Sequence, residues 1–297
     1  MERCLCGERT DAPWQVVGEV FVLNQRPSRN YQGDFVAWSG GCLLIGSGAG
    51  VVAPHSHYAI QLAIGAPSGL KVQFGRNGAW LACAAALIPS RAIHTIDVSD
   101  CQWSTVLFIE PETAEGRALS TRLQERLEIL DADAMAVTAK RLERAWRTQR
   151  STDAVRAVCR QLIEELSQTS PREPSDPRIL AAMEAIRSNV ARAVSLTEVA
   201  QEAHLSPSRF RHLFVEETGM PLRTYVLWRR LLQVWELLMQ GETYSTAAHA
   251  AGFADSAHLS RTARTMFGVA PSMLQMSGPL SSRLRHRHAT GAEQRVH

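Results

Sequence analysis

The 297-residue chain lacks the marks of secreted and membrane proteins. Its first residues, "MERCLCGERTDAPW", contain no apolar core of a signal peptide. No window of the sequence approaches the roughly 18 apolar residues that a membrane span requires. The six cysteines are scattered, without the spacing of a disulfide framework. We therefore expect a cytoplasmic protein with reduced thiols and no membrane partner.

Lysine is almost absent, since only Lys71 and Lys140 occur among 32 basic residues. Arginine supplies the remaining positive charge, and its planar guanidinium suits phosphate and guanine better than an ammonium does. The formal net charge of +3 is too small to indicate a nucleic-acid partner by itself. The apolar share of 45% is that of a globular protein, which excludes a disordered or fibrous chain, and the length allows two domains.

The first third of the chain predicts a β-rich domain. Short apolar or alternating runs occur there, separated by Gly, Pro, Asn and Ser turns: "VGEVFVL", "GCLLIG", "AIQLAIG", "LKVQF" and "WSTVLFI". This spacing is typical of a sandwich or a barrel. From about Thr113 onward helix-forming residues take over, with apolar positions every three or four residues. The stretch "SQTSPREPSDP" then has the composition of a linker, and helices are predicted from there to about Gln275.

Two segments near the C-terminus repeat each other. The stretch "SLTEVAQEAHL" matches "TYSTAAHAAGF" in its small and apolar positions, and "RFRHLFVEETG" further on aligns with "HLSRTARTMFG". Each copy predicts a short helix, a tight turn and a second helix, with alanines that let the two helices approach closely. The repeat therefore predicts two helix-turn-helix motifs.

Capping residues support these boundaries. Ser195 opens the first copy in the pattern "SLTE", a predicted capping box. Ser206 and Asp255 stand where the second helix of each copy begins, as predicted N-caps. Gly219 and Gly268 stand where those helices end, at positions suited to a left-handed residue.

The predicted outer face of each second helix carries groups suited to base edges and phosphates. These residues are Ser208, Arg209, Arg211 and His212 in the first copy, and Ser256, His258, Ser260, Arg261 and Arg264 in the second. The segment between the copies, "PLRTYVLWRRLLQVWELLMQG", predicts a helix about 30 Å long. Successive major grooves on one face of DNA lie about 34 Å apart, so the pair fits adjacent grooves. An α-solenoid is the alternative, but it usually needs three or more repeats.

The segment from "DPRILAAMEAIRSNV" to "GVAPSML" resembles the DNA-binding domain of AraC/XylS-family transcription regulators. The resemblance covers about a third of the chain and rests above all on the signature "GF…S.HLSR…FG..P". It implies two helix-turn-helix motifs joined by a long helix, bound to one face of operator DNA. The implied DNA-reading positions are Ser208, Arg209, Arg211, His212, Ser256, Ala257, His258, Ser260 and Arg261. Arg229 and Arg230 on the joining helix are expected to contact phosphate or to form an internal ion pair.

The second copy departs from the pattern in two places. Ala263 stands where the first copy has Phe214, and Ala257 stands where it has Ser208. An alanine in place of a core aromatic leaves a gap unless a neighbour such as Met266 fills it. We therefore expect the second copy to be less stably packed and less sequence-specific.

Histidines gather in two motifs of the β-rich domain. "PHSHYAIQLAIG" contains His55, His57 and Gln61, and "LIPSRAIH" contains His94. The two motifs are similar to those of cupins, with Gln61 where a metal-binding cupin commonly has Glu. His55 and His57 share one face of a strand, so together with His94 they are the candidate metal ligands. Because the acidic ligand is missing, we favour an effector pocket lined by His55, His57, Gln61 and His94, or hydrogen bonding of these residues inside the barrel. Trp38, Trp80 and Trp103 are candidate pocket walls, and core packing is the equal alternative for each.

The predicted helical region carries an apolar stripe: Leu123, Leu127, Leu130, Leu162, Ile163 and Leu166. Regulators of the family that the chain resembles usually dimerise through such helices, which predicts a homodimer. Packing of the stripe within its own chain is the alternative.

These patterns predict an α+β protein. Its expected parts are a cupin-like sensor barrel at 1–112, a helical dimerisation region at 113–170, a linker at 171–177, an all-α double helix-turn-helix domain at 178–277 and a disordered basic tail at 278–297. The predicted function is transcription regulation, with operator DNA and a small-molecule effector as partners, no enzymatic activity and no cofactor. The alternatives are a metal-dependent cupin enzyme fused to a DNA-binding module, and a constitutive DNA-binding protein whose barrel only dimerises.

Overall fold

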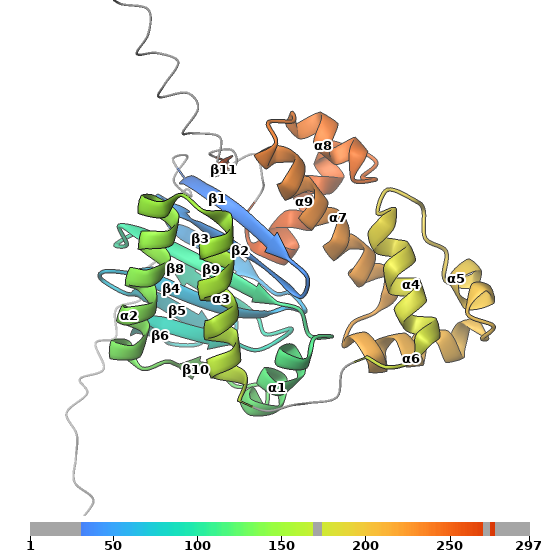
Figure 1. The fold of residues 1–297 in the computed structure, drawn as a ribbon, viewed down its shortest axis with the longest axis horizontal. Helices are drawn as coiled ribbons and strands as arrows, with labels where there is room; N and C mark the ends of the chain where they lie inside the picture. The colour runs from blue at the N-terminus through green and yellow to red at the C-terminus, as the bar shows by residue number, and fades with distance from the viewer. Residues whose placement is uncertain (1–30, 169–173, 270–273, 277–297) are drawn as a thin grey trace, which may run out of the picture.

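The computed structural model describes residues 31–168, 174–269 and 274–276. The described chain forms a sheet-rich N-terminal domain and a helical C-terminal domain (Figure 1). The predicted strand "VGEVFVL", residues 171–173 of the predicted linker and the predicted tail lie outside the described residues.

The strands of the N-terminal domain form two sheets. The seven-stranded sheet has the order β10-β7-β4-β9-β2-β1-β11, and the four-stranded sheet has the order β3-β8-β5-β6. The strands of the first sheet are β1 (Tyr31–Trp38), β2 (Gly41–Ser47), β4 (Ile60–Ala66), β7 (Ala85–Ile88), β9 (Trp103–Ile109), β10 (Glu128–Ile129) and β11 (Leu274–Met276). Those of the second are β3 (Val51–His55), β5 (Leu70–Phe74), β6 (Trp80–Cys83) and β8 (His94–Asp97).

Four of the predicted strands correspond to β2, β4, β5 and β9, so alternation and turn residues located them correctly. Among the described residues no hydrogen-bonded ladder joins the two sheets. The sheet-rich domain is therefore confirmed, whereas the closed barrel is not. Between the sheets lies an apolar core that includes Ala63 and Ile88 from one sheet and Val72 and Ile96 from the other.

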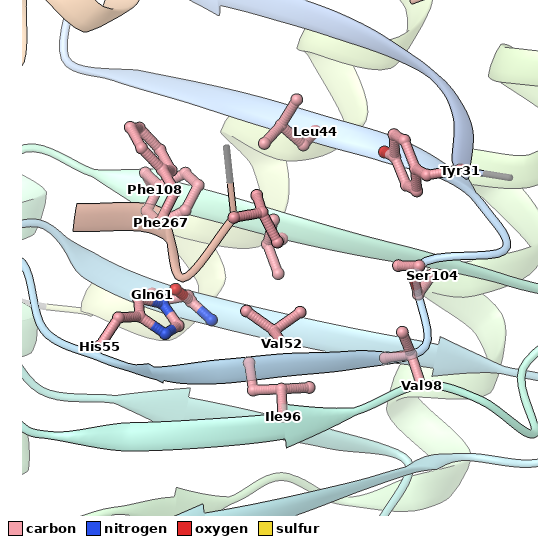
Figure 2. Close-up of a pocket in the computed structure, with 13 residues that line it drawn as sticks. Tyr31, Leu44, Val52, His55, Gln61, Ile96, Val98, Ser104, Phe108 and Phe267 are labelled. Carbon is pink, nitrogen blue, oxygen red and sulfur yellow. The ribbon is translucent and has the colours of Figure 1, made fainter. Parts of the chain in front are cut away.

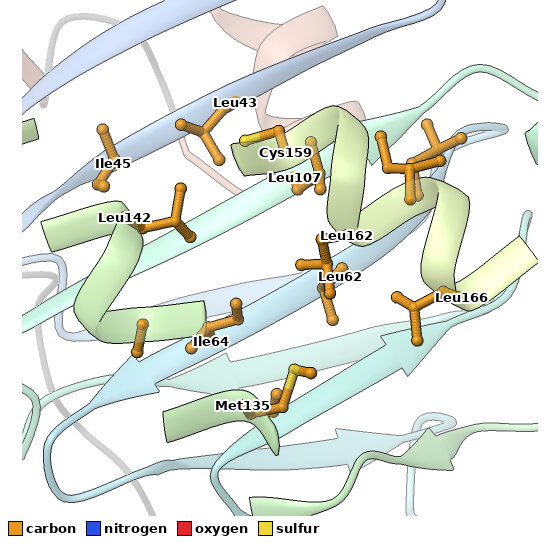
Figure 3. Packing of buried hydrophobic residues seen from close by; sticks show 14 of the residues in the cluster. Leu43, Ile45, Leu62, Ile64, Leu107, Met135, Leu142, Cys159, Leu162 and Leu166 are labelled. Carbon is orange, nitrogen blue, oxygen red and sulfur yellow. The ribbon is translucent and has the colours of Figure 1, made fainter. Parts of the chain in front are cut away.

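Helices cover the outer face of the seven-stranded sheet (Figure 3). They are α1 (Ala114–Leu123), α2 (Ala132–Glu143), the π-helical turn η1 (Arg144–Gln149) and α3 (Thr152–Ser167). Their apolar stripe, including Leu162, Ile163 and Leu166, is buried against strand residues such as Leu62 and Leu107. The stripe thus packs within its own chain, as the alternative held, and the homodimer stays a prediction.

The C-terminal domain contains two helix-turn-helix units joined by a long helix. The first unit is α5 (Leu196–Glu202) with α6 (Pro207–Thr218), and the second is α8 (Tyr244–Ala250) with α9 (Ser256–Phe267). The joining helix is α7 (Leu222–Met239), and α4 (Pro177–Ser188) packs on the first unit. No helix in the described part of the chain combines the length and apolarity that a membrane span requires.

The predicted caps of the two outward helices are confirmed. The Ser206 hydroxyl accepts from the Arg209 N–H, and the Asp255 carboxylate accepts from the His258 N–H. Gly219 and Gly268 end the helices with φ values of 73° and 70°. The predicted capping box is wrong, however, because Ser195 occupies the N-cap position without a side-chain hydrogen bond.

The end of the C-terminal domain differs from the helical prediction. Helix α9 stops at Phe267, and residues 274–276 form β11, which pairs in parallel with β1 at the edge of the seven-stranded sheet. The chain that follows the second unit therefore returns to the N-terminal domain.

Candidate DNA interface and sensor cavity

Helix α6 presents the predicted DNA-reading residues of the first unit to solvent. Phe210, Leu213 and Phe214 occupy the inward positions and are buried. The residues between them are exposed: Ser208, Arg209, Arg211 and His212. Because helical side chains repeat every 3.6 residues, the buried set fixes the outward set.

Helix α9 presents a smaller free surface. Ser256 and Arg261 are exposed, but His258 and Ser260 are half-buried. The Ser260 hydroxyl shares a 2.7 Å hydrogen bond with the Tyr244 hydroxyl, and the His258 ring lies edge-on to Phe253 at 5.2 Å. The second unit thus uses two of its predicted readers partly for its own packing.

Two of the three arginines of α7, Arg229 and Arg230, have internal roles. Arg230 donates hydrogen bonds to the backbone oxygens of Val190, Arg192 and Gly252, at 3.0, 3.0 and 2.7 Å. These acceptors flank the first unit and lie in the turn of the second, so Arg230 ties the two units together. Arg230 therefore makes internal hydrogen bonds in place of the expected internal ion pair, and its contact with phosphate stays a prediction.

Arg229 forms the expected internal ion pair, and it does so with the N-terminal domain. Its guanidinium lies 2.8 Å from Glu110 and 3.4 Å from Glu112, both of which are buried. Glu112 also faces Arg187 at 3.7 Å. Burial and the charge of Glu110 raise the pKa of Glu112 to about 8, although Arg229 opposes the shift.

A hollow of about 490 Å³ lies between the two units. Its lining includes Arg211 of α6, His258 of α9, and Arg223 and Arg230 of α7. Arginines from α6 and α7 therefore border one concave surface, an arrangement suited to a polyanion.

A second cavity lies between the two sheets of the N-terminal domain (Figure 2). Its volume is about 60 Å³, and its walls are mostly apolar. The lining residues are Tyr31, Leu44, Ala49, Val52, His55, Gln61, Ile96, Val98, Ser104, Val106, Phe108, Phe267 and Val269. Two of them, Phe267 and Val269, belong to the C-terminal domain, so the end of α9 forms part of the wall.

The predicted tryptophan walls are corrected. Trp38 packs on the outer, helix-covered face of the seven-stranded sheet, and Trp80 is exposed on the edge strand β6. Trp103 packs beside Trp146, in the same outer core. The sequence could not assign these rings to a face, because strand register was unknown.

The predicted histidines converge at one end of the cavity. One ring nitrogen each of His55, His57 and His94 lies within 4.8 Å of the other two, and all three residues are buried. Gln61 joins them, with Oε1 2.8 Å from His57 Nε2. The structure thus brings together the whole predicted histidine and glutamine set.

Burial lowers the pKa of each histidine, because a charged ring loses its hydration. The pKa of His55 falls to about 3, and that of His94 falls well below its usual value. His57 shifts in the same direction. The three imidazoles are therefore neutral at neutral pH, which is the protonation state of a metal ligand.

The fold and the outward helices define a class: a double helix-turn-helix domain fused to a two-sheet domain with an internal cavity. The comparisons with known proteins agree with this class. A family described as "Helix-turn-helix domain" matches residues 199–276. This match lies in the C-terminal part of the chain and agrees with the resemblance to AraC-type DNA-binding domains.

Two curated relatives match part of the chain. Transcriptional activator RhrA from Rhizobium meliloti is 32% identical over 118 residues, which cover 38% of this chain and 37% of that protein. HTH-type transcriptional activator RhaR from Pectobacterium atrosepticum is 31% identical over 107 residues, 36% of this chain and 38% of that protein. The chain therefore matches less than two fifths of either relative's length.

Solved structures resemble the chain over both domains. A variant of apo ToxT from Vibrio cholerae has a TM-score of 0.55 at 13% identity, covering 81% of this chain and 100% of that one. ToxT from Vibrio cholerae O395 has a TM-score of 0.52 at 14% identity, covering 80% of this chain and 99% of that one. At these identities the likeness establishes the fold alone, a sheet-rich domain followed by the helix-turn-helix domain.

Proposed function

We propose that the protein is a sequence-specific DNA-binding transcription regulator whose N-terminal domain binds a small-molecule effector. The observation that carries the proposal is the pair of outward helices α6 and α9, whose units are joined by the single helix α7. With 18 residues, α7 is about 27 Å long. This length is close to the repeat of the major groove, about 34 Å. Arg230 donates hydrogen bonds to backbone oxygens next to each of the two units and so fixes the distance between the units.

The exposed side chains support direct reading of DNA. Arg209, Arg211 and Arg261 have free guanidinium groups on the outward faces, suited to paired hydrogen bonds with guanine. Ser208, His212 and Ser256 supply smaller polar groups. Arg223, on the rim of the hollow between the units, suits a phosphate. The names of the curated relatives, transcriptional activators, agree with this role.

The cavity between the sheets supports the sensing role. Its walls are mostly apolar and include the polar residues His55 and Gln61, the usual composition of a small-ligand site. His57 and His94 belong to the same histidine cluster but do not line the cavity. An effector that binds one placement of the helix-turn-helix units more tightly than another shifts the population toward that placement. The site would then control operator affinity by differential binding.

The alternative of a metal-dependent enzyme has one observation in its favour, the histidine cluster. The curated relatives carry the names of activators, so we assign the cluster to sensing. A constitutive DNA-binding protein is the other alternative. A change in operator affinity when a ligand binds would exclude it. We also propose a homodimer, through a surface other than the buried stripe of α1–α3. Sedimentation of the full-length protein measures its oligomeric state.

The test of the proposal is genome-wide mapping of bound sites, followed by affinity measurements on the recovered sequences. The expected result is a shared motif with two elements about one DNA turn apart. Arg211→Ala should weaken binding to that motif, whereas Arg160→Ala, on the exposed face of α3, is the matched control with the same charge change. Equal binding to the motif and to scrambled DNA contradicts the proposal.

A further inference from the structure

The described residues that line the cavity between the two sheets include no Asp, Glu, Lys or Arg. Their polar groups are the phenol of Tyr31, the neutral imidazole of His55, the amide of Gln61 and the hydroxyl of Ser104. The other lining side chains are apolar. A charged ligand would lie in this cavity without a counter-charge, which is costly in a buried site. The lining therefore selects an uncharged and mostly apolar ligand.

Gln61 offers this ligand an unpaired hydrogen-bond acceptor. His57 Nδ1 lies 2.8 Å from the carbonyl oxygen of Ala59, so Nδ1 carries the hydrogen and Nε2 is an acceptor. The Gln61 amide faces this Nε2 at 2.8 Å and must turn its NH₂ group toward it. The other amide position is buried and has no partner among the described residues, and in this orientation it holds the carbonyl oxygen. In Figure 2 this position, drawn in blue, points toward Val52 and the cavity, where a ligand O–H or N–H can donate to it.

The cavity is small for such a ligand. Its volume is about 60 Å³, whereas an apolar cavity that holds one benzene molecule measures about 150 Å³. A molecule that fits the present space has few atoms, and each atom contributes only a limited share of the binding free energy. A ligand that binds tightly therefore has to move part of the wall.

The end of α9 is the part of the wall that moves most easily. Most lining residues lie on paired strands, such as β3 with β8 and β2 with β9, and their backbone ladders resist displacement. Phe267 and Val269 instead belong to the C-terminal domain. Phe267 packs on Trp228 and Trp235, which lie on α7 of the same domain. These ring contacts persist when the end of α9 moves together with its own domain.

Gly268 shows how closely the end of α9 is docked on the sheet. A Cβ at this position would lie 2.6 Å from Val52 Cγ1 and 2.7 Å from His55 Nδ1. Val52 and His55 also line the cavity. The backbone hydrogen bond from the Ser56 N–H to the Thr265 oxygen spans 3.4 Å, which is long. The docked end of α9 and an enlarged cavity therefore compete for the same strand, β3.

We propose that the cavity binds an uncharged, mostly apolar molecule of about the size of one aromatic ring, with one hydrogen-bond donor, and that this molecule displaces the end of α9 from β3. The proposal rests on the proposed function, because it names the class of the effector and the route by which it reaches the DNA-binding domain. The bound ligand and the docked placement of α9 exclude each other. Binding thus changes the placement of the second helix-turn-helix unit, and with it the operator affinity. By linkage, a substitution that loosens the docked placement tightens ligand binding.

The ligand class is tested on the full-length protein with three single-ring probes: phenol, benzene and benzoate. We expect phenol to bind one site per chain by calorimetry. Benzene lacks the donor and should bind about fivefold more weakly, the effect of one hydrogen bond. Benzoate carries an unpaired charge and should not bind at this site. Absent phenol binding, or benzoate binding as tight as that of phenol, overturns the ligand class.

Gln61→Leu tests where phenol binds. Leucine has no polar atom, so phenol and benzene should bind this variant with equal affinity. Gln102→Leu, at an exposed position, is the matched control and should keep the preference for phenol. A preference that persists in Gln61→Leu overturns the site. If Gln61→Leu does not fold, the three probes on the unchanged protein still decide the ligand class.

Displacement of α9 is tested with a matched pair of glycine variants. Gly268→Ala and Gly241→Ala both place alanine at a left-handed position, with φ values of 70° and 93°. The added Cβ meets β3 at Gly268, whereas nothing lies within 4 Å of it at Gly241. Gly268→Ala should therefore tighten phenol binding about threefold or more, and Gly241→Ala should leave it unchanged. Phe267→Leu shortens the same wall, should also tighten binding, and serves if Gly268→Ala does not fold. Phenol affinities that neither Gly268→Ala nor Phe267→Leu raises overturn the displacement.

Hydrogen exchange and operator affinity report the movement and its consequence. Phenol should speed amide exchange in the last turn of α9, because the ligand releases that turn from the sheet. Slower or unchanged exchange there contradicts the displacement. Saturating phenol should also change operator affinity about fivefold or more, and an unchanged affinity overturns the coupling. Failure to bind any specific DNA with or without phenol contradicts the proposed function instead, while the phenol titration still decides the site.

Discussion

The two helix-turn-helix units share a sequence pattern but differ in what forms their cores. The core of the first unit includes Phe210 and Phe214 and is built almost entirely from α4–α7. The core of the second unit merges with the N-terminal domain, because Phe35, Leu44 and Phe108 belong to the same cluster. The core of the first unit thus lies within its own domain, whereas the core of the second unit includes residues of the seven-stranded sheet.

One position of the repeat differs between the two units in a way that matches this difference in their cores. Phe267 of the second unit aligns with Thr218 of the first, one residue before the glycine that ends each helix. Thr218 bonds to backbone oxygens of its own unit, whereas Phe267 reaches the rings of Phe108 and Trp228. The comparison indicates that a signal from the N-terminal domain enters the DNA-binding domain at the second unit.

The largest effect is expected from Phe267→Ala. Removing a ring packed among three aromatics should cost about 3–5 kcal/mol of unfolding free energy. Thr218→Ala at the matched position of the first unit removes one hydroxyl and one buried methyl group and should cost about 2 kcal/mol. Denaturant titration of both variants measures the difference, and equal losses would remove the asymmetry between the units.

Arg229→Ala should have an effect of similar size. It leaves Glu110 and Glu112 buried without their shared cation, and breaking a buried pair costs about 3–5 kcal/mol. Arg223→Ala, at an exposed position of the same helix, is the control and should stay within about 0.5 kcal/mol. Denaturant titration measures the unfolding free energies of the two variants. A loss for Arg229→Ala no larger than that for Arg223→Ala would show that this ion pair does not hold the domains together.

Operator binding compares the units directly. Arg211→Ala in the first unit should cost about 1–3 kcal/mol of specific binding if its guanidinium reads a base. Arg261→Ala is the counterpart in the second unit, where fewer side chains are free, and we expect a smaller loss. Affinities for the operator and for scrambled DNA separate base reading from phosphate contact. A larger loss for Arg261→Ala reverses the ranking of the two units.

Salt provides a further check on the interface as a whole. Because several arginines neutralise phosphates, the logarithm of the operator affinity should fall steeply and linearly with the logarithm of salt concentration. Arg223→Ala should make this slope shallower by about one. A flat dependence contradicts the docking of both units on DNA.

The last prediction concerns the pH dependence of stability at the domain contact. The folded pKa of Glu112, about 8, lies above its ordinary value, so the folded protein binds this proton more tightly than the unfolded chain does. The resulting stability is present at low pH and is lost as pH rises from about 4.5 to about 8. The groups facing Glu112 are Glu110, Arg187, Arg229 and Tyr225. Glu112→Gln should flatten this part of the stability profile, and an unchanged profile assigns the dependence to another group.

The sequence predicted the DNA-binding domain better than the cavity. Local signals, such as Ser206, Asp255 and the two end glycines, determine where α6 and α9 begin and end. The histidines could also be grouped, although the strand β3 ends at His55 and His57 lies in the loop that follows, not on the same strand as predicted. Phe267 could not be assigned to the cavity, since its contact with the sheet depends on how distant segments pack. The same reason explains the errors on Trp38 and Trp80, whose faces depend on strand register.

The most direct test of the central claim is the affinity of the full-length protein for its mapped sites, measured beside scrambled DNA of equal length and composition. The account predicts a preference of about 10³-fold or more for the mapped motif. It also predicts that Arg211→Ala reduces this preference while Arg160→Ala preserves it. Equal affinity for both DNAs, or a preference that Arg211→Ala leaves intact, would contradict the account.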